Sequence, residues 1–144
     1  MRARELMSKN PACCTPDDTV QRAARLMVDC DCGCIPVVED SESNRLVGVI
    51  TDRDIAIRAI GHGRGADTKV RDVMTTDVRT AQPDDEVDAV EIIMIREQVR
   101  RVPVVDPDGR CVGIIAQADL AVKHGAATDS EVGRVVERIS EPAS

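Results

Sequence analysis

The chain has 144 residues, 42% of them hydrophobic, and its 19 basic and 26 acidic residues give a net charge of −7. A chain of this length can bury a compact core, and its negative charge argues against nonspecific nucleic-acid binding because phosphate backbones are repelled. The sequence contains no Phe, Tyr or Trp. Bases therefore cannot stack on aromatic side chains, and any purine must be held by aliphatic groups.

The hydropathy of the chain favours one location. The N-terminal residues lack the apolar core of a signal peptide, and no run approaches the ~18 apolar residues that a transmembrane helix needs. We therefore expect a cytoplasmic protein without a membrane partner. Its six cysteines would then meet a reducing environment, in which disulfides are uncommon.

The first half of the chain predicts a helix, a hairpin and a second helix. Apolar residues recur with the spacing of one helix face over 20–27. The β-branched runs 35–38 and 46–50 are bounded by turn-forming residues and predict two buried strands. Asp54 then opens a further helix, and the glycine-rich stretch 61–69 is predicted to be a linker.

The second half repeats the first. Pro103 follows Pro36 by 67 positions and Gly113 follows Gly48 by 65, so two residues have dropped out of the loop between the strands. Loops absorb such changes at little cost. We expect an α/β fold in which two pseudo-symmetric β-α-β-β-α repeats pack as one module, followed by a short C-terminal helix. The predicted divisions are a first repeat at 1–60, a linker at 61–69, a second repeat at 70–127 and a helical tail at 128–144.

A polar motif stands where the second strand of each copy passes into a helix. Thr51 and Asp54 have the spacing of a capping box, whose side chains bind free backbone N–H groups, and capping alone would explain both residues. The second copy has Ala116 in place of the hydroxyl but keeps Asp119. A capping box that lacks its hydroxyl residue is only a weak reason for the carboxylate of Asp119 to be present. A carboxylate here can instead accept hydrogen bonds from a ribose diol.

Together these motifs resemble the CBS domain family, in the form of a tandem pair called a Bateman module. The resemblance rests on the Pro-Val-Val strand, the Val-Gly strand and the Asp of each copy, and on two lead segments, Met74-Thr75 and its looser counterpart Met7-Ser8. It covers about residues 1–127 and points to small stand-alone bacterial CBS proteins of the hypoxic-response type. It implies adenosine-nucleotide binding in two clefts, where the Thr-x-x-Asp element of one copy faces the lead segment and Pro-Val-Val strand of the other.

The resemblance also implies which residues line the clefts. In the first cleft, hydroxyl and carboxylate would hold ribose and phosphate, apolar side chains would hold the purine, and arginines would neutralise phosphates; its residues are Val49, Thr51, Arg53, Asp54, Val78, Arg100, Arg101, Val102 and Pro103. Each arginine has the alternative of a solvated surface residue. The second cleft would consist of Ile35, Pro36, Ile114 and Asp119. We expect weaker binding there, or a less charged ligand, because it lacks both the hydroxyl and an arginine pair.

The cysteines have two interpretations. Cys30, Cys32 and Cys34 alternate with other residues, whereas paired zinc ligands usually enclose a two-residue loop, and no histidine is near enough to complete a site. We therefore favour packing, since Cys often behaves as a small buried hydrophobe. We predict no metal site and no catalytic residue, because no nucleophile elbow, metal-binding His pair or phosphate loop is visible.

The sequence therefore predicts a regulatory module, not an enzyme. It would bind an adenine nucleotide, AMP, ADP or ATP, with NAD and S-adenosylmethionine as alternatives, and signal by a change of conformation or assembly. We expect a homodimer that acts on an unknown protein partner in trans. Two rival functions remain open: a redox or metal sensor built on the cysteines, including Cys13 and Cys14, and a structural interaction protein with vestigial clefts.

Overall fold

A computed structural model describes residues 1–123, which form two compact units drawn from alternating parts of the sequence. Unit 1 takes residues 1–10, 79–107 and those from Val112 on, and unit 2 takes residues 11–78 and 108–111. The predicted helical tail at 128–144 lies outside the described residues. No helix within residues 1–123 is long and apolar enough to cross a membrane.

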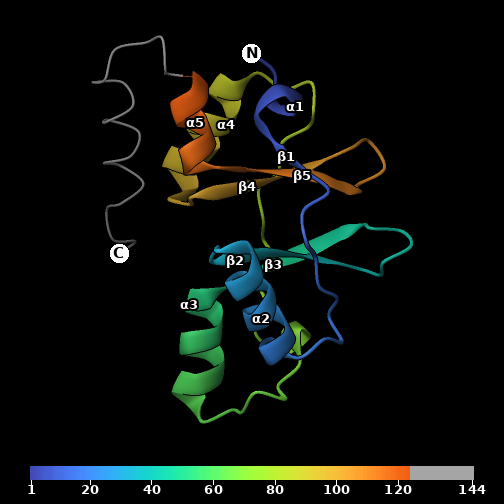
Figure 1. The fold of residues 1–144 in the computed structure, drawn as a ribbon, viewed down its shortest axis with the longest axis vertical. Coiled ribbons are helices and arrows are strands. Elements are labelled where there is room, and N and C mark those ends of the chain that lie inside the picture. Colours follow the sequence, from blue (N-terminus) through green and yellow to red (C-terminus); the bar gives the residue numbers. More distant parts are fainter. Residues whose placement is uncertain (124–144) are drawn as a thin grey trace. The chain divides into compact units, whose positions relative to one another are not determined.

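Unit 2 is a two-stranded hairpin covered by helices. Its elements are α2 (Val20–Cys30), β2 (Cys34–Val38), β3 (Leu46–Thr51), α3 (Asp52–Asp54), a π-helical turn (Ile55–Ala59) and two 3-10 turns (Ile60–His62 and Val70–Asp72). Helix α2 begins because the Thr19 hydroxyl accepts a hydrogen bond from the N–H of Arg22, and it ends at Asp31 in the left-handed conformation, with φ 51°. Helices α2 and α3 lie on one side of the hairpin (Figure 1).

The hairpin register decides which side chains face the core. Ile35 pairs with Ile50, and Pro36 pairs with Val49 in the antiparallel ladder. Residues that pair directly share a face of the sheet, and neighbours along a strand point to opposite faces. Ile35 and Ile50 belong to the hydrophobic core of unit 2, so Pro36 and Val49 lie on the face that points away from it.

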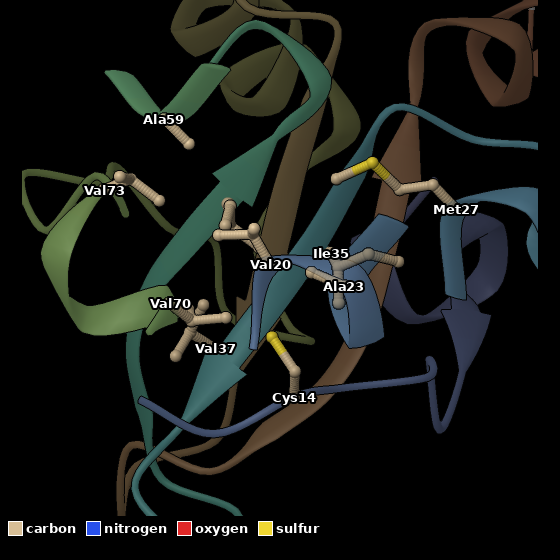
Figure 2. Packing of buried hydrophobic residues seen from close by; sticks show 10 residues of the cluster. Cys14, Val20, Ala23, Met27, Ile35, Val37, Ala59, Val70 and Val73 are labelled. Atoms are coloured by element: carbon tan, nitrogen blue, oxygen red, sulfur yellow. The ribbon is translucent and has the colours of Figure 1, made fainter. Parts of the chain in front are cut away.

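The core of unit 2 includes residues from the start of the second sequence copy. Val70 and Val73 are buried against α2 and the hairpin, beside Val20, Ile35 and Val37 (Figure 2). The N–H of Val70 donates to the carbonyl of Asp18 at 2.8 Å, which fixes this segment on the first copy. The chain therefore folds residues 70–78 into unit 2, although the repeat pattern assigns them to the second copy.

Unit 1 is a three-stranded sheet with helices on one side (Figure 1). Its elements are α1 (Ala3–Leu6), β1 (Ser8–Lys9), α4 (Val87–Glu97), β4 (Arg101–Val105), β5 (Cys111–Ala116) and α5 (Gln117–Lys123), with strand order β1-β5-β4. Strand β1 pairs Ser8 with Ile114. The first residues of the chain thus pack with the second copy, and Cys111, the first residue of β5, belongs to unit 2.

The pairings repeat between the units at the offsets found in the sequence. Thr75 bridges to Val49 in unit 2, as Ser8 pairs with Ile114 in unit 1. Each lead segment therefore lies against the second strand of the other copy, as the family resemblance implies. The α/β class, with a helix before and after each hairpin, is confirmed, whereas the predicted divisions near residues 60 and 70 stay predictions.

Candidate functional site

The carboxylate of Asp54 is the centre of a polar niche at the end of β3. Thr51 precedes α3, and its Oγ1 accepts a hydrogen bond from the N–H of Asp54 at 3.0 Å. In return, Oδ2 of Asp54 accepts from the N–H of Thr51, also at 3.0 Å. The capping box expected from the spacing is therefore fully formed, and it fixes the carboxylate at the junction of strand and helix.

Two further residues of unit 2 contact this carboxylate. Oγ1 of Thr75 lies 3.3 Å from both carboxylate oxygens of Asp54, and Nε of Arg58 forms an ion pair with Oδ1 at 3.8 Å. The guanidinium of Arg58 also donates to the carbonyls of Val73 and Met74 at 3.4 and 3.3 Å. Arg58 thus holds the lead segment of the second copy beside Asp54.

The niche keeps a charged group away from bulk water. Asp54 is only 8% exposed, and a buried carboxylate requires hydrogen bonds or a counter-charge to remain stable there. Thr51, Thr75 and Arg58 supply both. A carboxylate has about four acceptor positions, so Asp54 can accept from a ligand hydroxyl in addition to its protein donors.

The second copy has a simpler version of the same arrangement. Oδ2 of Asp119 accepts a hydrogen bond from the N–H of Ala116 at 2.7 Å. This contact is one half of a capping box, and it needs no hydroxyl at position 116. The missing hydroxyl is therefore a poorer argument against capping than the sequence suggested, because the carboxylate binds the backbone directly.

The predicted site residues divide between the two units. Unit 2 contains Ile35, Pro36, Val49, Thr51, Arg53, Asp54 and Val78, and unit 1 contains Arg100, Arg101, Val102, Pro103, Ile114 and Asp119. The structure brings Thr51 and Asp54 together, and it places Val49 beside Pro36 on the hairpin face that points away from the core. Ile35 and Val102 are fully buried in the hydrophobic cores of their units. These assignments to a ligand site stay predictions.

The three predicted phosphate-binding arginines differ in exposure. Arg53 and Arg100 are exposed and Arg101 is half-buried. Among residues 1–123 none of their guanidinium groups has an ion-pair partner. Their charges are thus not neutralised by a described carboxylate, in contrast to Arg58, whose partner is Asp54.

The cysteines do not form a metal cluster in the part of the chain that is described. No group of three or more His, Cys, Asp and Glu side chains within residues 1–123 is placed to hold an ion. Cys14 is buried in the core of unit 2, and burial raises the pKa of its thiol to about 12, with a further contribution from Asp18. This placement agrees with the packing interpretation for Cys14.

Sequence reasoning missed Thr75 and Arg58 as members of the niche. Thr75 was recognised as part of a lead segment but was not assigned to the site, although the pairing of lead segments with the opposite copy points to it. Arg58 does have a signal, because it follows Asp54 by four positions, the spacing of an ion pair on one helix face. Only its hydrogen bonds to the carbonyls of Val73 and Met74 depend on the turn that brings this segment back to β3.

Comparisons with known proteins agree on one family. The family model described as "CBS domain" matches residues 3–60 and 70–123. The CBS domain-containing protein YhcV of Bacillus subtilis is 39% identical over 121 residues, which are 84% of each chain. The crystal structure of Hypoxic Response Protein I with two coordinated zinc ions is 31% identical, with a TM-score of 0.77 over 85% of this chain and 98% of that one. The CBS domain pair of protein MJ0100, in complex with 5′-methylthioadenosine and S-adenosyl-L-methionine, is 30% identical, with a TM-score of 0.78 over 89% and 98%.

Proposed function

The chain belongs to the CBS domain family, and from this we propose that it is a regulatory module that binds an adenosine-containing ligand through Asp54. The observation that carries the proposal is the buried carboxylate of Asp54 at the end of β3, which accepts hydrogen bonds from the backbone N–H of Thr51 and the hydroxyl of Thr75. The related pair of MJ0100 binds two ligands that share an adenosine group. That common group is therefore the chemistry we assign to the ligand.

Asp54 suits the ribose of such a ligand. A ribose presents two adjacent hydroxyl donors, and an ionised carboxylate accepts two hydrogen bonds in a fixed direction. The capping box and Arg58 fix the orientation of this carboxylate before a ligand arrives. Little side-chain freedom is then lost on binding, which favours affinity.

The remaining roles depend on which adenosine ligand is bound. Arg53 follows Thr51 by two positions, is exposed, and has no ion-pair partner among the described residues. We propose that it contacts the phosphates of AMP, ADP or ATP, for which a guanidinium is well suited. The apolar roles of Val49 and Val78, and the second set built on Asp119, belong to the same proposal.

A regulatory function requires that the ligand prefer one state of the protein. A ligand with equal affinity for two conformations changes neither population. We propose that binding beside Thr75 stabilises the contact between the second lead segment and β3, since Thr75 touches both Val49 and Asp54. The change would pass to a second copy of the chain or to a protein partner.

Thermal unfolding with a ligand panel tests this proposal. The panel is AMP, ADP, ATP, 5′-methylthioadenosine and S-adenosylmethionine, each with the full chain. A ligand at 100 times its dissociation constant adds about 2.7 kcal/mol, which raises the melting midpoint by several degrees. The shift should shrink in Asp54→Asn and be largely kept in Asp119→Asn, because we expect weaker binding at the second set. If no member shifts the midpoint, or if both variants behave alike, the proposal fails.

A further inference from the structure

Two cysteines from distant parts of the sequence meet in unit 2. Cys13 and Cys111 stand 98 positions apart, yet their thiols are hydrogen-bond partners. Cys13 is half-buried and its Sγ also donates to the carbonyl of Pro11 at 3.2 Å, whereas Cys111 is fully buried. The pair is in the dithiol state, since neither residue forms a disulfide.

Backbone hydrogen bonds hold Cys111 in place. Its N–H donates to the carbonyl of Asn44 at 2.9 Å, and Nδ2 of Asn44 donates to the carbonyl of Cys111 at 2.6 Å. Next to this pair of residues, the N–H of Leu46 donates to the carbonyl of Gly109 at 2.9 Å. Segment 108–111 is therefore joined to the loop of the β2–β3 hairpin by a short ladder.

The main chain beside Cys13 is fixed as well. The N–H of Cys14 donates to the carbonyl of Pro36 at 3.1 Å, and the N–H of Val38 donates to the carbonyl of Cys14 at 2.9 Å. A disulfide demands that two backbones already lie at a suitable separation, because the bond itself spans little. The contact between the two thiols places the cysteines near each other on fixed backbones, and closure then requires rotation about their side-chain bonds.

We propose that Cys13 and Cys111 are a reversible redox pair that closes to an intramolecular disulfide on reaction with a low-molecular-weight disulfide such as oxidised glutathione. The thiolate of Cys13 attacks the oxidant, expels one small thiol and leaves a mixed disulfide on Cys13. The thiolate of Cys111 then attacks Sγ of Cys13 and expels the second small thiol. The two cysteines together lose two protons and two electrons, and the oxidant takes them up as two small thiols.

Closure would add a covalent bond to a noncovalent contact. In the dithiol state, the contact between segment 108–111 and the hairpin loop is noncovalent and includes the hydrogen bonds of Asn44 and Leu46. The disulfide would close the long loop between two residues 98 positions apart, and long loops give the largest stabilisation in the chain-entropy account. Oxidation would thus lock the loop of β2–β3 to segment 108–111.

The environment of the pair sets the pH dependence of closure. The hydrogen bond with Cys111 and, after it, burial raise the pKa of the Cys13 thiol above its ordinary value, and the neighbouring Cys14 adds to the effect. Only the thiolate attacks a disulfide. Closure should therefore be slow at pH 7 and accelerate as the pH rises towards 9.

Peptide mapping without reduction, after incubation of the full chain with oxidised glutathione, tests the proposal. The expected result is a cross-linked peptide pair containing Cys13 and Cys111, with a rise of roughly 10 °C in the melting midpoint that dithiothreitol reverses. Both effects should vanish in Cys13→Ala and in Cys111→Ala and remain in Cys30→Ser, which removes an exposed thiol.

Three outcomes would overturn the proposal. Cross-links confined to Cys30, Cys32 and Cys34 would assign oxidation to the other cysteines. Stable glutathione on Cys13 without a cross-link would show that Cys111 cannot reach it. An unchanged midpoint after cross-linking would contradict the locking effect. Circular dichroism of Cys13→Ala, whose side chain is only half-buried, verifies that the variant folds.

Discussion

Replacement of Gly48 by alanine should separate the second lead segment from β3. A Cβ at position 48 would lie 2.5 Å from the carbonyl oxygen of Thr75, a backbone atom that cannot rotate away. Gly48 does not have a positive φ, so the backbone itself tolerates alanine. The variant therefore tests only the close approach of the backbone at Gly48 to the backbone at Thr75.

The cost follows from the contacts that must open. Moving the oxygen to an ordinary contact of 3.4 Å stretches the two hydrogen bonds between Val49 and Thr75, now 2.8 and 2.9 Å long, beyond useful length. Each contributes about 1 kcal/mol, and the Thr75 contact with Asp54 adds a similar amount. Gly→Ala returns about 0.5–1 kcal/mol through the unfolded chain. The free energy of unfolding should fall by about 2 kcal/mol.

Urea unfolding followed by circular dichroism measures this change, because the chain has no aromatic residue for fluorescence. Gly65→Ala is the matched control, since its added Cβ would meet only the flexible carboxylate of Asp67 at 3.2 Å. The control should stay within about 0.5 kcal/mol of the parent chain. A Gly48→Ala variant as stable as the parent, or no less stable than Gly65→Ala, would refute the reasoning.

Two further predictions concern Cys14 and Ala116. Because burial raises the Cys14 pKa from 9.0 to about 12, its contribution to stability is complete below pH 9 and is lost as the pH rises from 9 towards 12. Cys14→Ala installs the equivalent residue of the second copy. Between pH 8 and 10.5, its free energy of unfolding in urea should fall less than that of the parent chain. The same fall with pH in both proteins would contradict this. Ala116→Thr should complete the capping box with Asp119 and raise the free energy of unfolding by about 0.5–1 kcal/mol. A destabilised variant would show that the second junction cannot accept the hydroxyl.

The sequence predicted the local elements well because the same patterns of apolar and turn-forming residues occur in both copies. The helix expected over 20–27 is α2, and the strands expected at 35–38 and 46–50 are β2 and β3. The helix after Asp54 was expected, but its π-helical turn at Ile55–Ala59 was not. Apolar spacing distinguishes a helix from a strand, but it does not reveal one extra residue in a turn.

The partners of the niche were harder to predict than its position. The spacing of Thr51 and Asp54 determines their mutual contacts, since a capping box is local. Thr75 reaches Asp54 only after residues 63–74 turn back to β3, and side-chain contacts at that sequence separation leave no periodic pattern. The ion pair of Arg58 with Asp54 is local, with a spacing of four residues, and was open to prediction. The contact of Cys13 with Cys111 likewise joins residues 98 positions apart and leaves no pattern in the sequence.

Titration calorimetry with paired ribo- and 2′-deoxyribonucleosides tests the central claim most directly. AMP and 5′-methylthioadenosine are each compared with their 2′-deoxy counterparts on the parent chain and on Asp54→Asn. A hydrogen bond to a charged group contributes about 1.5–3 kcal/mol, so loss of the 2′-hydroxyl should weaken binding to the parent chain at least tenfold. The same deletion should have a much smaller effect on Asp54→Asn. Equal losses in both proteins, or no binding of either ribonucleoside to the parent chain, would contradict the assignment of Asp54 to the ribose.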